Sequence, residues 1–217
     1  MVNNLPKVLR PSNKDGLAEG DRDKVNLKDV TDLDPRVGKE IRGLRKARDA
    51  TIADLSKATG LSKGYLSQIE RGISSPSIKA LHSISRALGV TISWFFPPQT
   101  DEDEALRDTV VRADGRRSLT FKNGITDELL SPNLDGEIEL LRCIFPPGST
   151  SGAEAYTHRG EEAGFVIEGR LDLWLDGRHI QLNAGDSFAF RSDRPHRYAN
   201  VTDETTIVIW SISPPTY

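Results

Sequence analysis

The sequence predicts a two-domain α + β protein, with a helical N-terminal half and an all-β C-terminal half. The hydrophobic period changes once along the chain. In residues 35–97 apolar side chains recur every three or four positions, as they do on helices that bury one face. Across residues 118–217 the period is two, as in strands that bury alternate side chains. Residues 98–117 contain an acidic run and are predicted to be the linker.

Five short helices are expected between residues 35 and 97. The hydroxyls of Thr51 and Ser62 suit the N-cap positions of the second and third helices. Ser75-Pro76 is expected to open the fourth helix, because proline fits the first helical position. Gly89 ends that helix, and a short fifth turn follows it. The result is a compact helical domain.

Several short strands with regular turn signals predict a β-sandwich or jelly-roll barrel in the C-terminal half. Leu171, Leu173 and Leu175 alternate with non-aliphatic residues, and Asp176-Gly177 after them is a strong hairpin signal. Cys143 lies among apolar neighbours and is expected to be a buried structural thiol. A reactive sensor thiol is the alternative.

Charge is distributed unevenly along a chain whose net charge is −3. Residues 35–97 carry 11 Lys and Arg against 4 Asp and Glu, whereas residues 98–217 carry 12 against 21. The basic segment favours a phosphate-bearing partner. Residues 1–34 are polar and are predicted to form a disordered arm. With one cysteine and no apolar run of the roughly 20 residues that span a bilayer, a cytoplasmic protein without membrane association is expected.

Residues 52–71 contain two short helical patterns separated by Thr59-Gly60-Leu61. Leu55 before this break, and Leu66 and Ile69 after it, have the spacing that packs two helices across a tight glycine turn. This layout is that of a helix-turn-helix, whose second helix can enter the major groove of DNA.

The phrases Gly-Leu-Ser-Lys-Gly-Tyr-Leu-Ser-Gln-Ile-Glu-Arg-Gly and Arg-Ala-Leu-Gly-Val within residues 36–96 resemble the Xre family of phage-repressor-like regulators. Ser56 departs from the alanine that is usual there. The resemblance implies a five-helix, lambda-repressor-like domain that binds double-stranded DNA. An amphipathic helical bundle that does not bind DNA is the alternative, which the basic charge of the segment makes less favourable.

The third helix of this domain should meet base edges. Lys63 could donate to guanine O6 and N7, and Gln68 could pair with adenine N6 and N7. Thr51, with the backbone N–H groups that follow it, could hold a phosphate. The residues expected to contact bases or phosphates are Thr51, Ser62, Lys63, Gly64, Tyr65, Ser67, Gln68, Arg71, Arg42 and Arg45.

Two segments of the C-terminal half carry metal-ligand residue types. Residues 156–169 contain His158 and Glu162, and residues 177–200 contain His196. Two imidazoles and one carboxylate form the set that suits Fe(II) and is also acceptable to Zn, Ni or Mn. Spacing alone does not bring them together.

Over residues 135–212 these segments are similar to the two cupin motifs, which implies a cupin β-barrel. Tyr156 stands where the first motif usually has a histidine, and Asn183 stands where the second usually has a proline. Cupin geometry implies that the barrel gathers the three ligand types around one divalent metal. The alternative is that they only hydrogen-bond an organic ligand. The residues expected to bind the ligand are Tyr156, His158, Glu162 and His196, of which the last three are the candidate metal ligands.

An Xre-type reader joined to a cupin barrel resembles a class of regulators in which the cupin binds a small metabolite. The sequence therefore predicts a DNA-binding transcription factor, a dimeric repressor controlled by a small effector. The acidic C-terminal half favours an amine or amino acid. One alternative is a metal-dependent cupin enzyme of the mononuclear Fe(II) oxygenase or epoxidase type. Another is a metabolite-binding protein whose helical domain only mediates assembly. The basic reading positions favour the regulator, so no enzymatic activity is expected.

Overall fold

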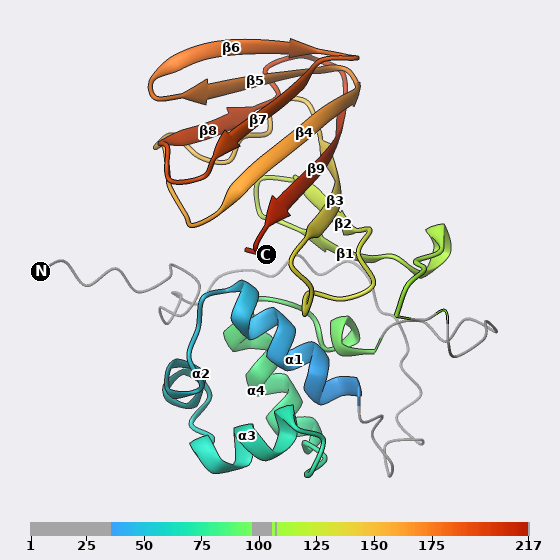
Figure 1. Cartoon of the computed structure of the whole chain (residues 1–217), viewed down its shortest axis with the longest axis vertical. Coiled ribbons are helices and arrows are strands. Elements are labelled where there is room, and N and C mark those ends of the chain that lie inside the picture. Colours follow the sequence, from blue (N-terminus) through green and yellow to red (C-terminus); the bar gives the residue numbers. More distant parts are fainter. Residues whose placement is uncertain (1–35, 97–105, 107, 217) are drawn as a thin grey trace, which may run out of the picture. The chain divides into compact units, whose positions relative to one another are not determined.

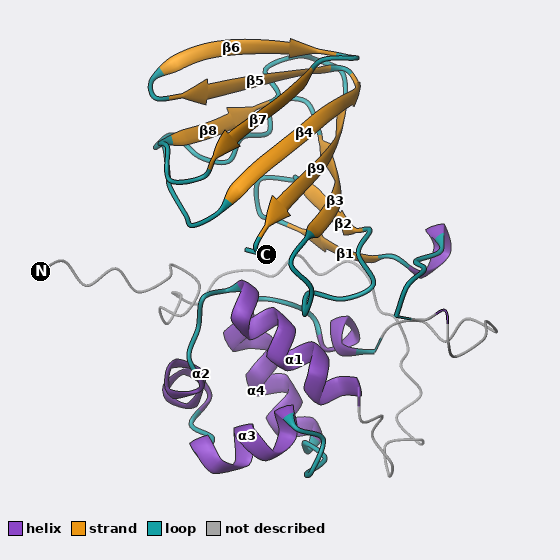
Figure 2. Cartoon of the chain, viewed as in Figure 1, coloured by secondary structure: helices purple, strands orange, loops and turns teal. Residues whose placement is uncertain are grey.

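The computed structural model describes residues 36–96, 106 and 108–216 (Figure 1). The chain divides into two compact units, one built of helices and the other of strands (Figure 2). The predicted arm, residues 1–34, and most of the first half of the predicted linker lie outside the described residues. No described helix has the length and apolar character needed to cross a membrane.

The predicted fold class is confirmed, with one difference in the helical unit. Within residues 36–96 the chain forms four α-helices, and the expected fifth element is a single 3₁₀ turn. The elements are α1 (Arg36–Ala47), α2 (Ile52–Thr59), α3 (Lys63–Glu70), α4 (Ile78–Leu88) and the 3₁₀ turn (Ile92–Phe95).

Side-chain caps define where these helices begin. As predicted, the hydroxyls of Thr51 and Ser62 each accept a hydrogen bond from the backbone amide three residues later. The predicted start of the fourth helix at Ser75-Pro76 is wrong. Helix α4 begins two residues further on, because the Ser77 hydroxyl accepts from the Ala80 amide at 3.2 Å and is the N-cap.

The turn between α2 and α3 is built as the sequence indicated. Gly60 has a φ of 73° and forms the left-handed C-cap of α2. The hydroxyl of Ser56 donates to the Leu61 carbonyl at 2.6 Å, so the serine that departs from the family pattern adds a bond across the turn. The two helices pack on a common core whose fully buried side chains include Ile41, Leu44, Leu55, Leu66, Ile69, Leu81, Ile84 and Leu88.

The second unit has two antiparallel sheets, as a cupin barrel requires. One sheet has the strand order β1-β2-β3-β9-β4-β7, and the other has the order β6-β5-β8. The strands are β1 (Arg117–Thr120), β2 (Thr126–Leu129), β3 (Glu139–Phe145), β4 (Glu161–Glu168), β5 (Arg170–Leu175), β6 (Arg178–Asn183), β7 (Ser187–Arg191), β8 (His196–Ala199) and β9 (Thr206–Ser213).

Side chains alternate along each strand, so every second side chain faces the barrel interior. Leu171, Leu173 and Leu175 are buried, as their spacing predicted. Asp176 and Gly177 both have positive φ, 51° and 76°, and form the two-residue hairpin turn between β5 and β6. Cys143 is a buried thiol.

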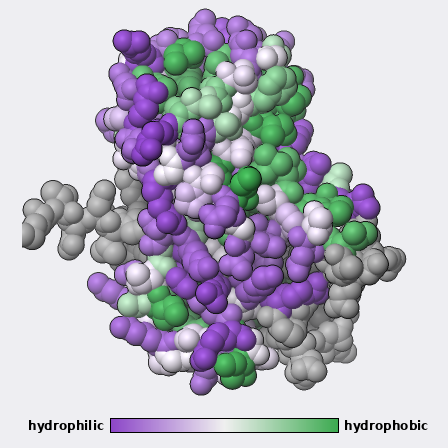
Figure 3. Space-filling model, viewed as in Figure 1, coloured by the Kyte–Doolittle hydropathy of each residue, from purple (hydrophilic) through white to green (hydrophobic). Residues whose placement is uncertain are grey.

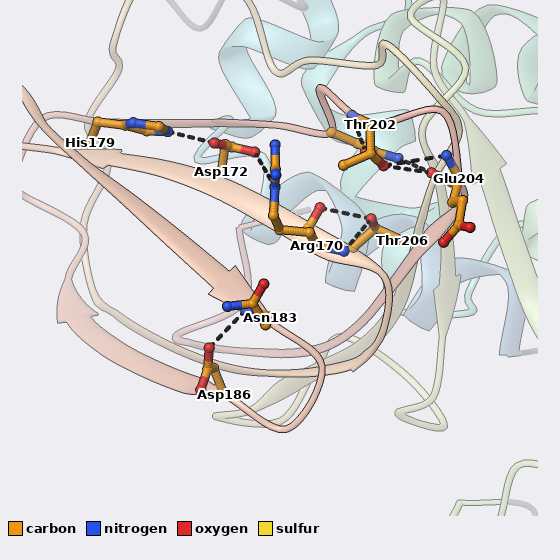
Figure 4. A network of polar contacts seen from close by, with 9 residues as sticks. Arg170, Asp172, His179, Asn183, Asp186, Thr202, Glu204 and Thr206 are labelled. Atoms are coloured by element: carbon orange, nitrogen blue, oxygen red, sulfur yellow. Dashed lines mark hydrogen bonds and ion pairs between the residues drawn. The ribbon is translucent and has the colours of Figure 1, made fainter.

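Polar contacts join neighbouring strands on the face of β5 that is opposite to its three leucines (Figure 4). The Asp172 carboxylate is 1% exposed and lies 2.5 Å from His179 Nε2 and 3.3 Å from Arg170 Nε. The backbone amide of Asn183 donates to the Asp186 carboxylate at 2.7 Å. A proline at position 183 could not make this bond, so asparagine offers a donor that the usual cupin residue lacks.

The outer side of the larger sheet carries exposed apolar side chains. Phe165 and Ile167 on β4 are 44% and 50% exposed, and Ile209, which is paired with Phe165, is half-buried. The space-filling view shows hydrophobic residues gathered on this unit between hydrophilic ones (Figure 3). Such a contiguous apolar surface is typical of an interaction site.

Candidate nucleic-acid interface and ligand site

Helix α3 presents most of the predicted base-contacting residues to solvent. Its N-cap Ser62 and its first residues Lys63 and Gly64 are exposed, as is Gln68 one turn later, whereas Tyr65 is half-buried. A Cβ added to Gly64 would meet no atom within 4 Å. The start of α3 is therefore an open surface on which a flat ligand such as a base edge could approach the backbone.

Two of these side chains are held by the loop that follows α3. The Tyr65 hydroxyl lies 3.4 Å from the Ser75 carbonyl and 3.4 Å from the Ser77 amide. The Gln68 side-chain oxygen accepts from the Ser74 hydroxyl at 3.1 Å. These contacts restrict the rotamers of Tyr65 and Gln68, so less conformational entropy is lost when the helix binds a partner.

The structure places Arg45 in the interior of the helical unit rather than on its surface. Its guanidinium donates to the Glu70 carboxylate through Nε at 2.6 Å and Nη2 at 2.8 Å, and to the Ala50 carbonyl at 2.7 Å. The Arg45 side chain is 11% exposed. We therefore correct the expectation of a phosphate contact for Arg45, whose donors fasten α1 to the end of α3. Arg42 and Arg71 remain exposed.

Thr51 takes part in a reciprocal capping box with Asp54. The Thr51 amide donates to the Asp54 carboxylate at 2.9 Å, and the Asp54 amide donates to the Thr51 hydroxyl at 3.1 Å. Hydrogen bonds from Thr51 lower the pKa of Asp54, so an anion already occupies the positive end of this helix dipole. The contribution of Thr51 to phosphate binding is expected to be small.

The barrel brings together the four residues predicted to bind a ligand. Nε2 of His158 lies 2.9 Å from Glu162 Oε1, and Nε2 of His196 lies 3.3 Å from the same oxygen. One donor atom from each residue of this triad lies within 4.8 Å of the others. The Tyr156 ring centroid is 4.4 Å from that of His196. Gly160, with φ of 107°, turns the chain between His158 and the strand that carries Glu162.

Further hydrogen bonds orient these donors. Nδ1 of His158 and of His196 lie 3.1 and 2.8 Å from backbone carbonyl oxygens, which only accept. Each Nδ1 therefore carries a proton, and Nε2 of each ring faces Glu162. A proton on Nε2 is shared with the carboxylate, and loss of that proton frees a lone pair for a cation. The indole N–H of Trp210 donates to the other Glu162 oxygen at 2.9 Å. Three electron-rich atoms thus converge, an arrangement that fits one divalent cation.

Burial and charge act in opposite directions on the pKa values of this triad. Burial lowers the pKa of His158, but the hydrogen bond to Glu162 and its charge outweigh this effect and raise the pKa. Burial raises the pKa of Glu162, but the hydrogen bond from His158 and the charge of His196 lower it below its ordinary value. The lowered pKa favours the ionised form of the Glu162 carboxylate. The His158 side chain is 22% exposed, so solvent reaches the triad on that side.

Sequence reasoning missed three polar or aromatic residues that face the barrel interior. Trp210 occurs in the alternating run Ile-Val-Ile-Trp, where it looks like an ordinary core residue. Tyr198 packs against it with ring centroids 4.9 Å apart. Asp127 lies in the polar run Thr-Asp-Glu-Leu, which has no apolar alternation to mark a strand. Only its parity with the buried Leu129 could have indicated that it points inward.

The two units correspond to two known families. The Helix-turn-helix family matches residues 41–95, and the Cupin domain family matches residues 141–212. Together they define a DNA-binding regulator with a ligand-binding barrel. The HTH-type transcriptional regulator SutR of Escherichia coli (strain K12) is 31% identical over 165 residues, which cover 76% of this chain and 87% of SutR. The chain belongs to this family of helix-turn-helix transcriptional regulators with a cupin domain.

Other similar proteins cover both units. The HTH-type transcriptional regulator PuuR of Escherichia coli (strain K12) is 27% identical over 181 residues, 83% of this chain and 96% of PuuR. An HTH_3 family transcriptional regulator from Vibrio cholerae is a similar solved structure, with 25% identity, a TM-score of 0.40 and coverage of 82% and 95% of the two chains. A hydroxypropylphosphonic acid epoxidase from S. wedmorenis has 17% identity, a TM-score of 0.40 and coverage of 82% and 97%.

Proposed function

We propose that this protein is a homodimeric repressor of transcription, and that a small molecule bound inside the barrel releases it from DNA. The observation that carries this proposal is the open face of α3 in a chain that belongs to a regulator family. Lys63 and Gln68 are its base-reading side chains, and Arg42 and Arg71 are its phosphate contacts. Gly64 lets the backbone approach the groove.

Alanine substitutions at the reading positions test this proposal. Lys63→Ala and Gln68→Ala should each weaken binding to operator DNA by about 1–3 kcal/mol relative to random duplex. Lys57→Ala on α2 is the matched control, since Lys57 is also exposed but is not placed at a base. Binding is measured by fluorescence anisotropy with duplexes from the protein's own promoter region. If wild-type protein does not prefer those duplexes at moderate salt, the proposal is wrong.

Dimer formation is proposed because two reading helices must lie about 34 Å or a multiple apart to meet successive major-groove faces. The apolar outer side of β4 supports self-association through the barrel. Phe165→Glu should convert the dimer to a monomer in light scattering and weaken operator binding. Val201→Glu is the control, because Val201 is 56% exposed but lies outside that sheet. A Phe165→Glu variant that stays dimeric contradicts the use of this face.

We infer that the triad binds a divalent metal, which would be held by His158, Glu162 and His196. The convergence of three donor atoms supports this inference. When bound, such a metal supplies a Lewis-acidic position for an oxygen or nitrogen of the effector. A divalent salt should raise the melting temperature of wild-type protein but not of His158→Ala. Equal shifts in both proteins would contradict a metal at the triad.

The same triad favours one rival function, a metal-dependent oxygenase. We propose that it serves sensing instead, because an effector with unequal affinity for the DNA-binding and released states is sufficient for control. A reporter gene under the protein's own operator separates these readings. Expression of the reporter should rise when the gene for this protein is deleted. Addition of the effector to cells that keep the gene should raise it as well. Consumption of the effector with added Fe(II), lost in His196→Ala, would favour the oxygenase.

A further inference from the structure

The loop that follows α3 holds the side chain of Gln68 in one orientation. Gly72, with φ of 69°, turns the chain after the helix. The backbone carbonyl of Gln68 then accepts hydrogen bonds from the backbone amides of Ile73 and Ser74 at 2.9 and 3.3 Å. The Ser74 hydroxyl donates to Gln68 Oε1 at 3.1 Å. Backbone and side chain of Ser74 thus both bind Gln68, so the turn itself places the hydroxyl at the amide oxygen.

The same loop is fastened to α3 at a second point. The Tyr65 hydroxyl lies 3.4 Å from the Ser75 carbonyl and 3.4 Å from the Ser77 amide, and Pro76 between them is buried. Ser74 therefore lies between two contacts of the loop with the helix. Because the loop is held on both sides in the free protein, little order has to be gained at Ser74 when a partner binds.

The hydrogen bond from Ser74 determines which end of the Gln68 amide is presented to a partner. A glutamine amide has an acceptor oxygen on one side and an NH₂ group with two donors on the other. Ser74 is half-buried whereas Gln68 is exposed, so the oxygen faces the covered side and Nε2 is directed away from it. Among the residues that the structure describes, none accepts a hydrogen bond from Nε2. The outer end of Gln68 is therefore a donor.

Base edges differ in how well they match such a donor. In the major groove guanine offers two acceptors, N7 and O6, whereas adenine offers one acceptor, N7, beside the N6 donor. Glutamine pairs with adenine through both ends of its amide, so that contact requires the oxygen as well as the nitrogen. In Gln68 the oxygen is held by Ser74, and the donors that remain at the outer end match guanine better than adenine.

We propose that Ser74 is a positioning residue, which fixes the Gln68 amide with its donors outward and so makes Gln68 favour guanine over adenine. This proposal rests on the proposed function, in which α3 enters the major groove of the operator. Ser74 acts through Gln68 and needs no contact with a base. When the hydroxyl is removed, the amide is free to turn over and pair with adenine. The base preference at this position should then change, and not only the affinity.

The test begins by locating the base pair that Gln68 reads. Duplexes are selected from a randomised pool with wild-type protein and with Gln68→Ala, and the position sought is the one whose preference is lost in the variant. Duplexes with each base pair at that position are then titrated in fluorescence anisotropy. Wild-type protein should prefer guanine to adenine. Ser74→Ala should lower this ratio of affinities about three- to tenfold, the bias that one neutral hydrogen bond gives.

Further variants separate positioning from a phosphate contact of the loop. Ser74→Thr keeps the hydroxyl and should retain the wild-type ratio. Ser75→Ala removes the neighbouring hydroxyl but keeps the backbone carbonyl that meets Tyr65, and it should also retain the ratio. In the Gln68→Ala background, Ser74→Ala should leave the ratio unchanged, because a residue that acts only through Gln68 has no effect without it. Circular dichroism shows whether each variant is folded.

The proposal is overturned if Ser74→Ala keeps the wild-type ratio, if Ser74→Thr loses it as Ser74→Ala does, or if wild-type protein prefers adenine at the Gln68 position. It is also overturned if Ser74→Ala changes the ratio equally with and without Gln68. Wild-type protein that selects a specific duplex and gives one of these results contradicts only the role of Ser74. Wild-type protein that selects no duplex from the pool contradicts the proposed function, and the role of Ser74 with it.

Discussion

The replacement Asp127→Asn should change how the stability of the strand unit depends on pH. Burial raises the pKa of Asp127 from its ordinary 3.8 to about 6, although a hydrogen bond from Cys143 opposes the shift. Between these two values the folded protein keeps a proton that the unfolded chain has lost. The free energy of unfolding therefore falls as pH rises through this window. A shift of about 2 pK units at about 1.4 kcal/mol each makes the loss about 3 kcal/mol.

Urea unfolding followed by tryptophan fluorescence measures this effect at a series of pH values. Asparagine cannot ionise, so the stability of Asp127→Asn relative to wild type should increase by about 3 kcal/mol from acid to neutral pH. Any constant cost of the lost Cys143 contact shifts the whole curve without changing its slope. Asp203→Asn should show no such increase, because Asp203 is exposed. A difference between Asp127→Asn and wild type that does not vary with pH would refute the buried carboxyl.

Three substitutions in the helical unit have distinct outcomes. Gly64→Ala should raise the free energy of unfolding by up to about 1 kcal/mol, because alanine favours the helix and its Cβ meets open space. The same change should weaken operator binding in fluorescence anisotropy, and unchanged binding would exclude close approach of DNA at Gly64. Gly38→Ala should lower the free energy of unfolding in urea by at least about 2 kcal/mol, because the added Cβ would overlap the Ile69 carbonyl oxygen. An unchanged free energy would contradict this packing of α1 on α3. Glu70→Ala should lower the free energy of unfolding by about 3–5 kcal/mol in the same measurement, because it leaves the Arg45 guanidinium buried without its anion. A loss below about 1 kcal/mol would mean that Arg45 turns to solvent.

The sequence predicted the features that depend on local chemistry. Caps at Thr51 and Ser62 and the turn at Gly60 follow from the conformations and hydrogen bonds that these residue types favour. The start of α4 was misplaced because two serines compete for the cap. Proline at the first helical position favoured Ser75, but the chain uses Ser77, whose hydroxyl reaches the Ala80 amide.

Features that depend on pairs distant in the chain could not be predicted in the same way. The burial of Arg45 depends on its ion pair with Glu70, which is 25 residues away in the sequence. Helical spacing placed Arg45 near the buried stripe of α1, but a charged residue there was interpreted as exposed. Asp127 was missed for a related reason, because its strand has no apolar alternation. Its inward face follows from the buried Leu129 on the same strand and from its buried partner Cys143.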